Sequence, residues 1–96
     1  MNQFELIFTI EIDGRPTIAF EAKNLREAME LCHAHWMRND VMALSSGGVP
    51  LCTPISKLKA RIAQAPERER YRTIEHLVQA SEDLMLAYLV PLDGLG

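Results

Sequence analysis

Long hydrophobic runs and cysteines are scarce in this sequence of 96 residues. No apolar run approaches the ~20 residues that a helix needs to cross a bilayer, which argues against a membrane span. Residues 1–5 carry no basic side chain and an early acid, so they do not have the pattern of a secretion signal. The only cysteines are Cys32 and Cys52. Without a secretion signal, two cysteines indicate reduced thiols in a cytoplasmic protein.

Motifs of catalysis are also missing. The sequence has no G-x-S-x-G nucleophile turn and no obvious pair of catalytic carboxylates. Residues 45–48, Ser-Ser-Gly-Gly, offer backbone N–H groups that can hold an anion. They lack the lysine and the following helix of a phosphate-binding loop, so we expect a simple turn. The sequence therefore predicts no enzyme and no cofactor.

Cys32, His33 and His35 are the residues of this sequence best suited to bind a metal or to supply a nucleophile. His33 and His35 are two residues apart, so on a helix they point in directions roughly 200° apart and cannot share a ligand. A zinc site at Cys32 and His35 would need Cys52 and His76 to converge on them. Cys32 falls on an apolar stripe, whereas Cys52 falls in a predicted loop and is the better candidate for a reactive thiol. We predict no metal site.

The first twenty-two residues predict a β-hairpin. Apolar residues alternate with mostly polar ones at Phe4, Leu6, Phe8, Ile10 and Ile12, and again at Ile18, Phe20 and Ala22. Asp13-Gly14 between them is a strong turn signal. A two-residue loop would mix the two apolar faces, so we predict a three-residue loop, residues 12–14. That register places Phe8 opposite Ile18 and Leu6 opposite Phe20.

The next segment, residues 24–38, predicts a single helix. Asn24 suits the N-cap, and Glu27 has the spacing to accept from the Asn24 backbone N–H. Arg38 suits the negative end of the helix, with Asn39 as a stop. The stripe that would face the core is Leu25, Ala28, Met29, Cys32 and Trp36.

The second half of the chain predicts more sheet and one more helix. We expect a strand at residues 41–44, and a brief return at 49–52 that Pro50 confines to an edge. Residues 55–63 alternate as a strand does, although a helix starting at Thr53-Pro54 is an alternative. Residues 67–80 predict a helix. Residues 84–90 are apolar on both faces, as in a central strand, and residues 92–96 are expected to fray.

These elements predict one domain, residues 1–96, of the α+β class. The expected architecture is a mainly antiparallel sheet of four to five strands with two helices packed on one face, in the order β-β-α-β-(β)-α-β. The expected core comprises Phe4, Leu6, Phe8, Ile10, Ile18, Phe20, Met29, Cys32, Trp36, Leu58, Ile62, Ile74, Val78, Leu84, Leu86 and Tyr88.

Charge is divided unevenly along the chain. Six of the ten basic residues lie in residues 57–72, where only Glu67 and Glu69 are acidic, although the net charge of the whole chain is −3. The candidate anion-binding residues are Lys57, Lys59, Arg61, Arg68 and Arg72. Nucleic acid is a poor partner, since Tyr71 is the only aromatic residue in this segment and the protein is acidic overall.

A strand followed by Asn-Leu-Arg-Glu-Ala-Met-Glu-Leu (residues 24–31) is similar to the strand-to-helix step of HicB-like antitoxin domains. The similarity covers about a quarter of the chain. The Gly-Cys element that those domains carry ahead of the helix is missing, so we transfer no functional residue.

The sequence favours a cytoplasmic module that associates with itself, as a homodimer, or with another protein, without catalysis. The apolar last strand and the divided charge motivate this expectation. The alternative is a module that binds a small ligand or an anion through residues 57–72. Apolar association should survive high salt, whereas anion binding should weaken.

Overall fold

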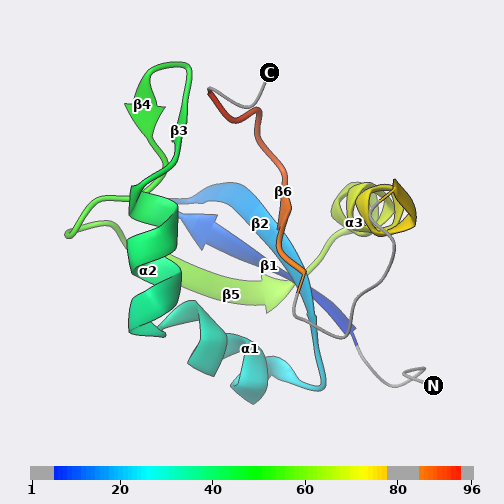
Figure 1. Cartoon of the computed structure of the whole chain (residues 1–96). Helices are drawn as coiled ribbons and strands as arrows, with labels where there is room; N and C mark the ends of the chain where they lie inside the picture. The colour runs from blue at the N-terminus through cyan, green and yellow to red at the C-terminus, as the bar shows by residue number, and fades with distance from the viewer. Residues whose placement is uncertain (1–5, 78–84, 94–96) are drawn as a thin grey trace.

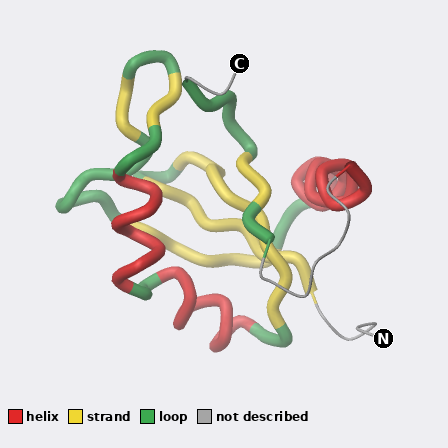
Figure 2. The backbone as a smooth tube through the Cα atoms, in the orientation of Figure 1, coloured by secondary structure: helices red, strands yellow, loops and turns green. Residues whose placement is uncertain are grey.

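The computed structural model describes residues 6–77 and 85–93. Within these residues, four antiparallel strands form a sheet in the order β5-β1-β2-β6, accompanied by three helices and a separate small hairpin (Figures 1 and 2). The elements are β1 (Leu6–Ile12), β2 (Arg15–Ala22), α1 (Leu25–Cys32), α2 (His35–Met42), β3 (Ser45–Ser46), β4 (Val49–Pro50), β5 (Leu58–Ile62), α3 (Ala65–Leu77) and β6 (Ala87–Tyr88). The α+β class and the approximate element order are confirmed. None of the helices in the described part of the chain is long and apolar enough to cross a membrane.

The hairpin of β1 and β2 has a two-residue turn. Asp13 and Gly14 have φ angles of 52° and 84°, the positive values that the tightest hairpin turns require. Phe8 lies opposite Phe20, so the predicted pairing of Phe8 with Ile18 is wrong by two residues.

A bulge explains how the apolar side chains still share a face. The register shifts between Ile10 and Glu11, which pair with Ile18 and Pro16, so that Thr17 is an extra residue in β2. The prediction places the odd residue in the loop, whereas the structure places it inside β2.

The sheet is covered on both faces, which differs from the prediction that both helices pack on one face. The even-numbered residues of β1 from Phe8 and those of β2 from Ile18 face α1 and α2, and Ile7 and Ala19 face α3 (Figure 1). On that prediction the face that carries Ile7 and Thr9 is left without a helix, whereas α3 covers it. The larger core cluster comprises Phe8, Ile10, Ile12, Ile18, Phe20, Ala22, Ala28, Cys32, Met37, Val41, Cys52 and Leu58.

The single helix predicted for residues 24–38 is two helices. Asn24 is the N-cap of α1, and its Oδ1 accepts from the Glu27 N–H at 2.9 Å. The Glu27 carboxylate accepts from the Lys23 N–H at 3.2 Å instead of the predicted Asn24 N–H. The helix α1 ends at His33, its C-cap. Ala34 has an extended conformation and is the N-cap of α2.

This break changes which side chains reach the core. Met37 and Val41 of α2 are fully buried, whereas Met29 and Trp36 are about half exposed, contrary to the prediction. Val41 and Met42 complete α2, so the strand predicted at residues 41–44 is wrong. Leu6 and Ile62 are also about half exposed, and Phe4, Val78 and Leu84 lie outside the described residues.

The remaining strands agree with the sequence only in part, because β3 forms at Ser45–Ser46, where the sequence predicts a turn. β3 and β4 pair briefly, and β5 confirms the strand interpretation of residues 55–63. β6 pairs only with β2 among the described strands, so the predicted central strand is an edge strand. It is apolar on both sides because Ala87 packs on the α3 side and Tyr88 on the α1–α2 side.

Candidate functional site

Arg61 of β5, a predicted anion-binding residue, is engaged by two carboxylates. Its Nε donates to Glu11 at 2.6 Å, and its Nη1 and Nη2 each donate to Glu67 at 2.8 Å. Glu67 also accepts from the Thr9 hydroxyl and from the Gln64 N–H, both at 2.9 Å. The Arg61 guanidinium, as the largest influence, lowers the pKa of Glu67 to about 2. This cluster fastens α3 to the sheet.

Of the other four predicted residues, two already have partners and two are exposed lysines. Arg68 donates to the Ala63 carbonyl at 2.8 Å, and Arg72 donates to Glu75 at 2.9 Å. Lys57 and Lys59 are exposed. Anion binding by residues 57–72 therefore stays a prediction that depends mainly on the two lysines.

A phenol–carboxylate pair lies between α3 and β2. The buried Tyr71 hydroxyl donates to Glu21 Oε1 at 3.0 Å, and burial raises the pKa of both groups. Arg72 Nη1 lies 3.9 Å from the other Glu21 oxygen. A phenol whose pKa is raised and whose proton is already donated is a poor acid catalyst at neutral pH, so we assign this pair a packing role.

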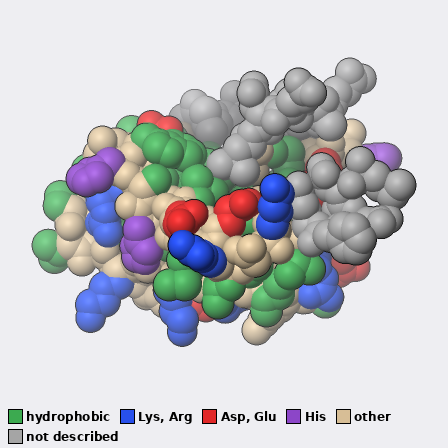
Figure 3. Space-filling view, turned by 90° about the horizontal axis from the view of Figure 1, so that it is seen from below, with side chains coloured by type: hydrophobic (Ala, Val, Ile, Leu, Met, Phe, Trp, Pro, Cys, Tyr) green, Lys and Arg blue, Asp and Glu red, His purple; other side chains and the backbone are tan. Residues whose placement is uncertain are grey.

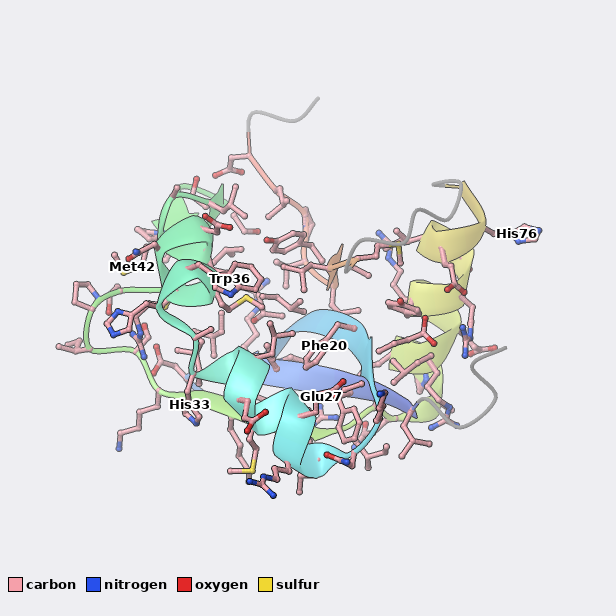
Figure 4. All side chains as sticks on the ribbon, turned by 60° about the horizontal axis from the view of Figure 1, so that its bottom comes forward. Phe20, Glu27, His33, Trp36, Met42 and His76 are labelled. Atoms are coloured by element: carbon pink, nitrogen blue, oxygen red, sulfur yellow. The ribbon has the colours of Figure 1, made fainter. Side chains whose placement is uncertain are left out.

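The cysteine and histidine residues do not converge. Figure 4 shows His33 and His76 at opposite sides of the molecule, and neither side chain is buried. Residues 6–77 and 85–93 contain no group of three or more His, Cys, Asp or Glu side chains placed to hold a metal. Cys32 and Cys52 are both buried free thiols, and burial raises the pKa of Cys32 to about 11.

Both cysteines should therefore react slowly in the folded protein. Thiolate is the reactive form, and burial shields both thiols from a reagent. At Cys32 the raised pKa also leaves little thiolate at neutral pH. We expect a thiol-specific disulfide reagent at pH 7.5 to modify Cys32 and Cys52 at least tenfold more slowly than in the urea-unfolded chain. Peptide mapping assigns each rate. Rapid modification of Cys52 alone would instead support the prediction that it is reactive.

An exposed apolar surface lies where α1 meets the sheet. We call it the α1–β5 patch: Leu6, Leu25, Met29 and Ile62, each between 46% and 51% exposed. Leu6 pairs with Ala22, three residues before Leu25, and Phe8 pairs with Ile62, so these positions share one end of the sheet. Figure 3 shows exposed hydrophobic side chains interspersed with lysines and arginines on this side of the molecule.

The sequence predicts Leu6, Met29 and Ile62 to be in the core, and it places Leu25 on the same helical stripe as Met29. Leu25 and Met29 have the four-residue spacing of a buried stripe, and Ile62 has the alternation of an inward-facing strand residue. Periodicity identifies the face of an element but not how far the neighbouring layer extends over it.

Comparison of the chain with protein-family models, curated proteins and solved structures gave no match.

Proposed function

We propose that this protein is a non-catalytic cytoplasmic module that binds a second copy of itself through the α1–β5 patch. The observation that supports the proposal is that four large apolar side chains, on α1 and on the ends of β1 and β5, are each about half exposed. Grouped exposed apolar residues are typical of association surfaces, whereas single ones are ordinary. Burying the patch between two copies would remove them from water.

Charges on α1 favour a second copy as the occupant. Arg26 and Glu30 flank Leu25 and Met29 on α1, and both are strongly exposed, with their charged groups 3.9 Å apart. In a two-fold arrangement with antiparallel α1 helices, Leu25 would lie near the partner's Met29, and Arg26 near the partner's Glu30. A surface that is complementary to itself is what a two-fold dimer requires.

Helix contacts are a better basis for this dimer than continuation of the sheet. β5 pairs only with β1 among the described strands, so its other edge is not paired with any of them. Ile62 of the patch is the last residue of this edge strand. Lys59 lies at the middle of β5 and is exposed. Lysine on an edge strand disfavours pairing with another strand, because charge would be brought against charge.

The test is the oligomeric state of the Met29→Glu variant. Placing a charge at the centre of an apolar interface should raise the dimer dissociation constant at least tenfold, measured by sedimentation equilibrium and native mass spectrometry. Dimerisation of the unchanged protein should persist at 1 M salt, where the Debye length is about 3 Å.

Ile55→Glu provides the matched control, since Ile55 is 90% exposed in a loop outside the patch. It introduces the same charge and should leave the dissociation constant unchanged. A protein that is monomeric at every accessible concentration would contradict the proposal. Equal weakening by both variants would show that added negative charge, not the patch, controls association.

A further inference from the structure

The turn between β3 and β4 holds a carboxylate of the same chain. Asp93, 45 residues further along, accepts from the Gly47 N–H at 2.9 Å and from the Gly48 N–H at 2.7 Å. The Ser45 hydroxyl donates to the same carboxylate at 3.2 Å. The segment that was expected to fray is thus attached at Asp93, while residues 94–96 lie outside the described part of the chain.

The backbone of the turn is shaped for this contact. Gly47 and Gly48 have φ angles of 61° and 80°, values that place two successive N–H groups where one anion can accept from both. A side chain would be strained at either position for conformational reasons, although a Cβ atom would meet nothing within 4 Å. The turn is therefore open to solvent and requires glycine.

We propose that residues 45–48 form an oxyanion-binding site whose resident occupant is Asp93, which an external carboxylate or phosphate displaces. Two backbone N–H groups and a hydroxyl recognise oxygen atoms that carry negative charge, and nothing in this set is specific to aspartate. The Asp93 carboxylate is charged near neutrality, as an aspartate ordinarily is, and the Gly48 and Gly47 N–H groups lower its pKa further. Gly47, Gly48 and Asp93 are exposed and Ser45 is half-buried, so an external anion can reach the two N–H donors.

The occupant also limits what the turn can bind. The Asp93 N–H donates to the Ser45 carbonyl at 2.9 Å, so two kinds of contact hold the same residue against the turn. An attached carboxylate competes at an effective concentration on the order of millimolar. An external anion therefore occupies the site only when its concentration and affinity together exceed those of the attached carboxylate. Asp93 is thus an intramolecular competitor for the turn.

The experiment follows the Gly47 and Gly48 amide resonances by NMR in the unchanged chain and in the Asp93→Ala variant. The variant should first lose the downfield shift that a charged acceptor produces. Inorganic phosphate should then restore the shift in a saturable manner, and the unchanged protein should respond only at higher phosphate concentration. Acetate in a parallel titration distinguishes a general oxyanion site from one that prefers phosphate.

Asp13→Ala is the matched control. Asp13 is also an exposed turn aspartate, and its carboxylate accepts from the Lys57 N–H at 3.0 Å, away from the β3–β4 turn. Its loss should leave the Gly47 and Gly48 resonances and their phosphate response unchanged. If phosphate and acetate leave these resonances of the Asp93→Ala variant unmoved, the turn is only an internal fastening. The Asp93→Asn variant, which keeps the size of the side chain, tests in the same way whether phosphate replaces the carboxylate. The resonances of Gly47 and Gly48 report on the turn whether or not the protein dimerises.

Discussion

Replacing Phe20 by alanine is expected to lower the free energy of unfolding by about 3–5 kcal/mol. Phe20 is fully buried in β2, and its ring centroid lies 6.4 Å from that of Phe8 on the neighbouring strand. Removing the ring leaves a cavity between the sheet and the helices α1 and α2, where neighbouring side chains can refill it only in part. A domain of this size has a total stability of roughly 5–15 kcal/mol, so the variant will lie close to unfolding.

Urea unfolding, monitored by circular dichroism, measures the decrease in the free energy of unfolding. Trp36→Ala is the informative control, because Trp36 is 47% exposed on α2 although its spacing assigns it to the core. It should cost at least about 2 kcal/mol less than Phe20→Ala, since much of its surface is already in water. Should Phe20→Ala not fold, Phe20→Leu keeps the comparison measurable. Equal costs at the two positions would contradict the burial that the structure assigns to them.

Features encoded by a few adjacent residues were predictable from the sequence. Asn24 caps α1 because its own side chain reaches the first turn, and Asp13-Gly14 forms a turn because both residues tolerate positive φ. The alternation of Leu58, Ala60 and Ile62 likewise identified β5. Each of these signals is complete within about five residues, so no knowledge of the tertiary structure is needed.

Features that depend on how layers meet were not predictable. No glycine or proline marks the break at His33-Ala34, after which α2 buries Met37 and Val41. The extra residue at Thr17 could not be predicted either, because a bulge in the strand and a longer loop both restore the same alternation of apolar side chains. The position of β6 at the sheet edge depends on strand pairing that apolar character alone does not determine.

The candidate sites show the same division. The basic residues 57–72 were visible as composition, but the partners of Arg61 come from two other elements, β1 and α3. Residues 45–48 were recognisable as a potential anion-binding turn, whereas Asp93 as its occupant is a contact between distant parts of the chain. Composition thus identifies which groups are present, and only the fold determines which of them already have partners.

Replacing Glu67 by glutamine is expected to lower the free energy of unfolding by about 2–3 kcal/mol at pH 7. The carboxylate accepts from Arg61, Thr9 and Gln64, and the side chains of Glu67 and Arg61 are only 13% and 22% exposed. An amide has the same shape but places an N–H₂ group against some of these donors and leaves Glu11 as the one carboxylate that Arg61 contacts. The matched control is Glu75→Gln, which removes a carboxylate paired with the more exposed Arg72 and should cost about 1 kcal/mol or less.

The pH dependence identifies the charge as the cause of this loss. The pKa of Glu67 is about 2 in the folded protein and near 4.5 ordinarily, so the unfolded chain binds the proton more readily. Its contribution is therefore fully present above pH ~4.5 and is lost as the pH falls toward 2. Urea unfolding of the two proteins between pH 7 and pH 2.5 should show their stability difference shrinking over this range. A difference that stays constant down to pH 2.5 would mean that the glutamine variant is destabilised by altered packing, and that the Arg61–Glu67 ion pair contributes nothing to the attachment of α3.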